Sequence, residues 1–152
     1  MKIRKATARD TLAIIALMKQ LIDEHRRSDK YYKPFSLYRG LPEYVQKAIR
    51  DSKKLLLTAE MDKKIVGYLL VAIEPAPFYS SEKKIGVIAD TVVSKKYRRQ
   101  GILKKMFLQA QKWLRGKKIR YFELSVDARN KSAVRSWKKL GFSNYKLRLR
   151  KA

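Results

Sequence analysis

The chain has 152 residues, a length suited to one domain with a single core, and its 38 Lys and Arg against 13 Asp and Glu give a formal charge of +25. It has no cysteine and one histidine, which excludes disulfides, thiolate metal sites, a cysteine nucleophile and a histidine metal cluster. No apolar run approaches the length of a membrane span, so we expect a cytoplasmic protein with no membrane contact and no metal.

The N-terminal pattern predicts a strand followed directly by a helix. Residues 2–6 have the composition of a short strand, and Thr7 and Asp10 then stand in the Thr-x-x-acid form that begins many helices. Apolar residues recur at helical spacing until about residue 25. They are Leu12, Ile15, Met18, Leu21 and Ile22.

The middle of the chain predicts a loop, a helix and a hairpin. Residues 28–41 are irregular and rich in aromatic and basic side chains, which is typical of a loop. Residues 42–52 favour a second helix. Two apolar stretches, at 55–60 and 65–73, are joined by a short polar turn and therefore predict two antiparallel strands.

In the C-terminal half, strand patterns alternate with helix patterns. We expect strands at 85–93, 119–126 and 142–150, and helices at 102–115 and 131–140. The complete order is β, α, α, β, β, β, α, β, α, β. Such an order predicts a single α/β (α+β) domain over residues 1–152, with a mixed, strongly twisted sheet between helices on both faces.

A basic turn containing Gly101 joins the strand at 85–93 to the helix that follows. Backbone N–H groups at a helix start are unpaired and lie at the positive end of the helix dipole, so a phosphate there meets several donors. Gly101 allows the backbone to come close to a ligand, and Arg98 and Arg99 add planar donors for phosphate oxygens. The turn therefore predicts a pyrophosphate-binding site.

This turn resembles the acetyl-CoA loop of the Gcn5-related N-acetyltransferases, whose pattern is Arg or Gln, two residues, Gly, one residue, then Gly or Ala. The pattern begins here at Arg98, and Leu103 departs from it by replacing the final small residue. A second stretch, from residue 124 to residue 142, is also similar to the family. Its matching positions are Asn130, Ala133, Gly141 and Phe142, with Trp137 where the family usually has Tyr.

The resemblance implies an acyl-CoA N-acyltransferase fold, with acetyl-CoA as cosubstrate in a V-shaped opening. The opening would lie between the strand before the turn and the strand after the next helix. Strand backbone would hold the pantetheine arm, the turn would hold the pyrophosphate, and Asn130 would contact the thiol end. The cofactor-binding residues so implied are Thr91, Val92, Val93, Arg98, Arg99, Gln100, Gly101, Ile102, Leu103, Lys104, Asn130, Ala133 and Trp137.

For catalysis the resemblance points to the positions of Asp90, Ser125 and Trp137. The usual general acid is the Tyr that Trp137 replaces, and an indole N–H cannot serve as an acid at physiological pH. If the strand is regular, Asp90 points away from a face that carries no ionisable side chain. That face comprises Val87, Ala89, Thr91 and Val93.

Two functions are compatible with these observations. One is an N-acetyltransferase in which a protein or small-molecule amine attacks the thioester directly. The other is a catalytically weak or inactive module that binds CoA, nucleic acid or the ribosome, because residues 91–152 hold 20 Lys and Arg against 2 acidic residues, a net +18. Homodimers occur in the family, and no pattern in the sequence marks an interface.

Overall fold

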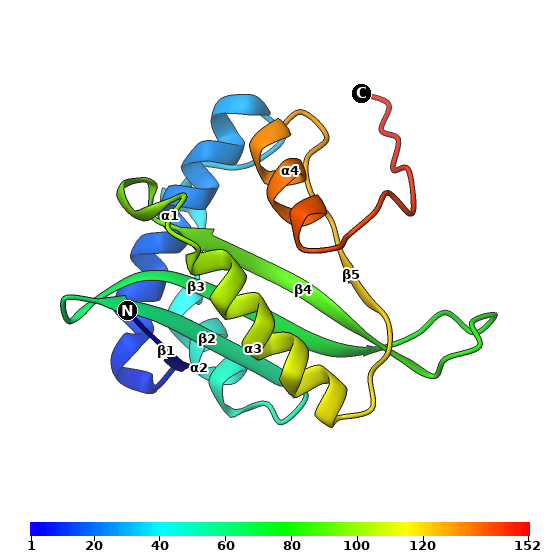
Figure 1. Ribbon diagram of the computed structural model, residues 1–152. Coiled ribbons are helices and arrows are strands. Elements are labelled where there is room, and N and C mark those ends of the chain that lie inside the picture. The colour runs from blue at the N-terminus through cyan, green and yellow to red at the C-terminus, as the bar shows by residue number, and fades with distance from the viewer.

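The computed structural model describes residues 1–152 and contains five strands, four helices and three short 3-10 turns (Figure 1). The strands and helices are β1 (Lys2–Lys5), α1 (Thr11–Ser28), α2 (Leu41–Arg50), β2 (Lys54–Met61), β3 (Lys64–Pro75), β4 (Lys84–Val93), α3 (Ile102–Gly116), β5 (Phe122–Leu124) and α4 (Lys131–Lys139). The 3-10 turns lie at Ala8–Asp10, Phe35–Leu37 and Lys95–Tyr97. None of the helices is both long enough and apolar enough to cross a membrane.

The five strands form one sheet in the order β1-β2-β3-β4-β5. All neighbours are antiparallel except β4 and β5, which are parallel. The predicted pairing of the two apolar stretches in the middle of the chain is confirmed by β2 and β3. The sheet is therefore mixed, as the element order indicates.

Helices cover both faces of this sheet: α3 lies over one face, and α1 and α2 lie over the other (Figure 1). Successive side chains of β2 point to opposite faces of the sheet, so this one strand contributes to the core on both faces. Leu55 and Leu57 pack in the core cluster under α3, whereas Leu56 packs in the cluster under α1 and α2. Each helix buries its apolar stripe against one of these two clusters.

The start of the first helical segment is fixed by Asp10. The Thr7 N–H donates to its carboxylate at 2.8 Å and the Thr7 hydroxyl donates at 3.2 Å. Arg4 of β1 donates two further bonds to the same carboxylate, at 2.7 and 2.9 Å. The predicted start at residues 7–10 is confirmed, as a 3-10 turn that leads into α1.

A β-bulge in β4 overturns the expectation that Val87, Ala89, Thr91 and Val93 share one face. Leu70 of β3 is paired with Asp90 and the next residue of β3 is paired with Ile88, which leaves Ala89 without a partner. One extra residue reverses the alternation beyond it. Accordingly Ile88 packs under α3, whereas Val92, four residues later, packs under α1 and α2.

The C-terminal segment also differs from the prediction, because the strand expected at 142–150 is absent and the one expected at 119–126 is only three residues long. β5 offers too short an edge for another strand to pair with. Leu147 and Leu149 are consequently 82% and 83% exposed. Near its end the segment is held by Arg150, which forms an ion pair with Asp29 and places its guanidinium 4.8 Å from the centre of the Tyr31 ring.

Candidate active site

The turn between β4 and α3 presents a row of unpaired backbone donors. The six N–H groups from Arg99 to Lys104 have no hydrogen-bond acceptor within the protein, and we call this row the amide cradle. Arg99 and Gly101 adopt positive φ angles of 64° and 75°, a conformation in which glycine is not strained. A cradle of consecutive N–H groups at a helix N-terminus is suited to a phosphate or pyrophosphate.

Basic side chains of the turn divide into two roles. Arg98 donates to the Val93 carbonyl at 2.8 Å and to the Glu24 carboxylate of α1 at 2.8 Å, so its guanidinium fastens the turn to its surroundings. Arg99 and Lys104 are exposed and form no ion pair. These two side chains therefore remain free to meet an anion in the cradle.

Leu103, the residue that departs from the family pattern, is half-buried and packs against the core cluster under α3. Its neighbour Ile102 is 2% exposed. The larger side chain therefore points into the core, while the Leu103 N–H stays in the cradle.

β4 and β5 are paired over only a few residues and then separate. Their register covers Gly86 to Ile88 of β4 only, and it ends where the bulge at Ala89 begins. From there the two strands diverge toward α4, as Figure 1 shows. Thr91, Val92 and Val93 pair with β3 on one side of β4, and on the other side, toward β5, no strand pairs with them and they line one side of this opening.

The other side of the opening is formed by β5 and the start of α4. Ser125 is exposed immediately after β5. Asn130 precedes α4, and its side-chain oxygen accepts a hydrogen bond from the Ala133 N–H at 3.1 Å. This is an ordinary N-cap, and it leaves the amide NH₂ of Asn130 available as a donor.

Trp137 lies in the core. It is 6% exposed and meets Phe107 and Phe142 edge to face, with ring centroids 6.0 and 5.4 Å away. These ring contacts hold α4 against α3. A role for Trp137 toward the cofactor stays a prediction.

Asp90 lines a pocket of about 380 Å³ between α1, α2 and β4. The Tyr68 hydroxyl donates to its carboxylate at 2.5 Å. Burial raises the pKa of Asp90, although the bonds from Tyr68 and from the Thr91 N–H oppose that shift. Burial next to this carboxyl also raises the pKa values of Tyr68 and Tyr44. The carboxyl group is thus a stronger proton acceptor than an ordinary aspartate, and it lies in a pocket that a ligand can enter.

Sequence reasoning did not identify Tyr68 and Tyr44. Tyr68 is fully buried in β3, where an isolated polar tip among Val66, Leu69 and Leu70 could have signalled a buried partner. Tyr44 comes from α2, twenty-four residues earlier in the chain. Only the packing of α2 across the sheet brings it near Asp90.

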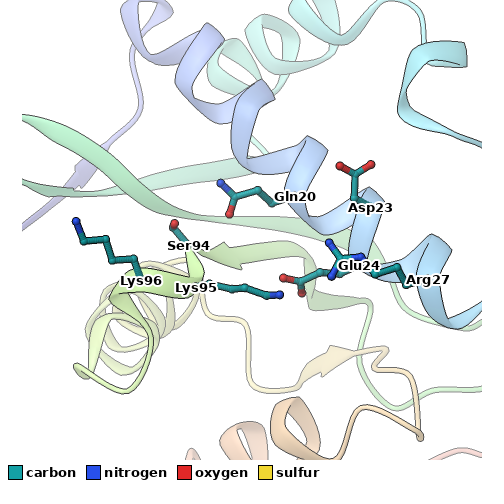
Figure 2. A pocket seen from close by; sticks show the side chains of 7 residues that line it. All are labelled: Gln20, Asp23, Glu24, Arg27, Ser94, Lys95 and Lys96. Atoms are coloured by element: carbon teal, nitrogen blue, oxygen red, sulfur yellow. The ribbon is translucent and has the colours of Figure 1, made fainter.

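A second, polar cavity of about 320 Å³ lies between α1 and the start of the turn (Figure 2). Its walls carry both signs of charge, with Glu24 and Lys95 directed toward each other (Figure 2). Because Glu24 forms an ion pair with Arg98, this cavity belongs to the connection that holds the turn on α1. No group of three or more His, Asp or Glu side chains is arranged to hold a metal ion.

Residues 16–142 match the model of the acetyltransferase (GNAT) family. No curated protein matches the chain.

Solved structures share the fold along nearly the whole chain. A tetramutant of the BH1408 protein of Bacillus halodurans is 22% identical with a TM-score of 0.90, covering 100% of this chain and 99% of that one. The aminoglycoside N-acetyltransferase AAC(6')-Iy in complex with CoA is 17% identical with a TM-score of 0.74, covering 99% of each chain. The enzyme AAC(6')-IG from Acinetobacter haemolyticus is 16% identical with a TM-score of 0.76, covering 100% of this chain and 97% of that one.

Proposed function

This chain belongs to the acetyltransferase (GNAT) family, and from that premise we propose that it transfers the acetyl group of acetyl-CoA to an amine in a ternary complex. Acetyl-CoA is the cosubstrate of the family. The observation that carries the proposal is the bulge at Ala89, which separates β4 from β5 and also turns Asp90 into the pocket under α1 and α2. A cofactor cleft and an acceptor pocket thus meet at one point of one strand.

The residues present fit acetyl-CoA. The amide cradle, with Arg99 and Lys104 beside it, supplies donors and positive charge for the pyrophosphate. Backbone groups from Thr91 to Val93 would bind the pantetheine amides, and the NH₂ of Asn130 would reach them from across the opening. Residues 1–152 would then form one catalytic domain around the single sheet.

We assign Asp90 the role of general base. An acceptor ammonium would give a proton to the Asp90 carboxylate, and the neutral nitrogen would attack the thioester carbonyl. The C–N bond forms and the C–S bond breaks, and the nitrogen then loses its second proton, which water carries to the CoA thiolate. The products are the acetylated amine, the CoA thiol and protonated Asp90. Ser125 is exposed after β5 and Trp137 is buried in the core, and neither has an ionisable group suited to that last step, so we expect water to replace the Tyr acid of the family.

Calorimetric titration with acetyl-CoA tests the cradle. Gly101→Asp places a side chain and a negative charge among the unpaired N–H groups, and we expect it to weaken binding at least ten-fold. Gly116→Asp is the matched control, because it adds the same charge at the other end of α3, where an added Cβ meets no atom within 4 Å. Equal affinity in the two folded variants would remove the cradle from the cofactor site.

A second candidate function, binding of nucleic acid or the ribosome, is favoured by the composition of α3 and α4. Neither helix contains an acidic residue, and their exposed basic side chains form no ion pair. These side chains are Lys104, Lys105, Lys112, Arg115, Lys131, Arg135, Lys138 and Lys139. One cofactor requires few of them, which leaves a surface suited to a polyanion.

A further inference from the structure

We propose that the acceptor is a monoamine with an apolar body, such as an arylalkylamine, and that the pocket above Asp90 disfavours polyamines and aminoglycosides. This inference rests on the proposed acetyl transfer. It concerns the acceptor alone, which neither the family match nor the structural comparisons specify.

The walls of the pocket are mostly apolar. Three side chains come from α1, two from the segment before α2 and two from α2 itself, and β4 contributes Asp90. They are Met18, Leu21, Ile22, Tyr38, Arg39, Leu41 and Tyr44. Apart from Met18, each of these side chains is at least partly exposed and available to a ligand. Apolar walls favour a hydrocarbon body and leave most hydroxyl groups of a sugar without partners.

The pocket contains a single carboxylate. Asp90 is the only acidic residue that lines the pocket. The nearby acids of α1 face the other way: Asp23 pairs with Lys19, and Glu24 pairs with Arg98 at the turn. The lining of the pocket therefore offers one carboxylate for one ammonium group.

Arg39 opposes a second positive charge. Its guanidinium donates to the carbonyls of Ser36 and Tyr38, at 2.6 and 3.2 Å, and no acidic residue pairs with it. A ligand with one ammonium on Asp90 and others further out would bring like charges together beside Arg39. An aminoglycoside or a polyamine has several such groups, whereas an arylalkylamine has one.

The experiment measures binding and turnover separately. Phenethylamine, hexylamine, spermidine and kanamycin would be titrated calorimetrically into the protein saturated with CoA, and turnover would be followed by the CoA thiol released from acetyl-CoA. A thiol reagent suits this assay because the protein has no cysteine. We expect phenethylamine and hexylamine to bind, and to exceed spermidine and kanamycin at least ten-fold in kcat/KM.

Charge reversal at the rim sharpens the test without depending on full activity. Arg39→Glu should shift the ratio of spermidine to phenethylamine binding at least ten-fold toward spermidine. Arg50→Glu makes the same charge change at the exposed end of α2, outside the pocket, and should leave the ratio unchanged.

The outcomes separate the two proposals. Binding of phenethylamine without turnover would uphold the acceptor class and contradict acetyl transfer. Turnover of kanamycin or spermidine equal to or above that of phenethylamine would overturn the acceptor class and uphold acetyl transfer. Absence of phenethylamine binding, or a ratio unmoved by Arg39→Glu, would also overturn the acceptor class.

Discussion

Asp90 and Asp10 are both withdrawn from solvent, and their surroundings move their pKa values in opposite directions. Burial is the main cause at Asp90, where the pKa is raised although the bonds from Tyr68 and from the Thr91 N–H oppose the shift. At Asp10 the bidentate bond from Arg4 outweighs burial, and the pKa is lowered. The first carboxyl is suited to move a proton, and the second to hold the fold.

We predict that Asp90→Asn lowers activity and raises stability. Removal of a general base costs roughly 10²–10⁴-fold in rate. Because the raised pKa means that ionising Asp90 weakens the folded state as pH rises above 3.8, the variant should be more stable near pH 8 by about 1 kcal/mol, and equal to the parent in acid. Activity assays and urea unfolding at pH 8 and pH 3 measure both effects.

The same measurements can contradict this assignment. Full activity of Asp90→Asn would remove Asp90 as the base. The activity of the parent should fall as the pH is lowered through the raised pKa of Asp90. If Asp90→Asn keeps some turnover and its activity lacks this fall, the assignment of Asp90 as the base is supported. Tyr68→Phe serves as the control, since it removes the hydroxyl that donates to Asp90 but leaves the carboxyl in place.

Asp10→Asn should behave in the opposite sense. The ion pair with Arg4 contributes stability that is fully present above the unfolded pKa of 3.8, and that is lost as pH falls through the lowered folded value. We expect a loss of about 2 kcal/mol at pH 7 that shrinks toward pH 2. Chemical denaturation across this range checks it, and a loss that does not vary with pH would show that the charge is unimportant.

At the scale of elements, local patterns predicted most of the fold. The apolar stretch at residues 55–60 and the helical spacing in α1 and α3 depend on neighbours within a few positions, and the structure follows them. The bulge at Ala89 could not be predicted in this way, because it depends on how β4 pairs with β3. The strand expected at 142–150 failed for a related reason: its pattern alternates correctly, but β5 is too short to pair with it.

The candidate site likewise has one part that the sequence predicts and one part that depends on long-range packing. Gly101 and the basic residues of the turn are contiguous, so the sequence alone predicts an anion site there, and the N–H groups of the cradle are arranged accordingly. Asp90 was a candidate from the sequence as well. Its pocket was not, since α1, α2 and β4 come together only through long-range packing.

The end of β4 requires a small residue opposite it. An added Cβ on Gly67 would lie 2.9 Å from the Val92 carbonyl oxygen, in the part of β4 that leads into the turn. We expect Gly67→Ala to lower stability by about 1–3 kcal/mol and to weaken acetyl-CoA binding. Gly116→Ala is the control, because its Cβ meets no atom within 4 Å and alanine suits a helix end. Comparable thermal and urea midpoints for the two variants would contradict the close approach.

For the molecule as a whole, the charge is distributed unevenly over the two layers of helices. α1 and α2 include acidic residues, whereas α3 and α4 have none. Cofactor and polyanion would both be drawn to the α3 side, and the acceptor pocket opens on the other face. The acceptor and the basic surface therefore need not compete.

Binding to RNA tests the basic surface. We predict that the protein binds single-stranded or duplex RNA with an affinity that falls steeply with salt. Lys105→Glu with Lys112→Glu should reduce the slope of log K against log salt by roughly 1–2, and reversal of Lys2 and Lys63 in the N-terminal half should change it little. Fluorescence anisotropy at several salt concentrations measures the slope. Undetectable binding at low salt would leave the surface without a polyanion partner.

The amide cradle has a consequence for hydrogen exchange. Six consecutive amides without acceptors should exchange their protons for deuterium as quickly as an exposed peptide does, although they adjoin one of the best-packed helices of the protein. A pyrophosphate seated on them would make them hydrogen-bonded and slow their exchange together. The peptide spanning residues 99–104 can therefore report occupancy of the cradle by deuterium uptake, with no acceptor, no turnover and no chemical label.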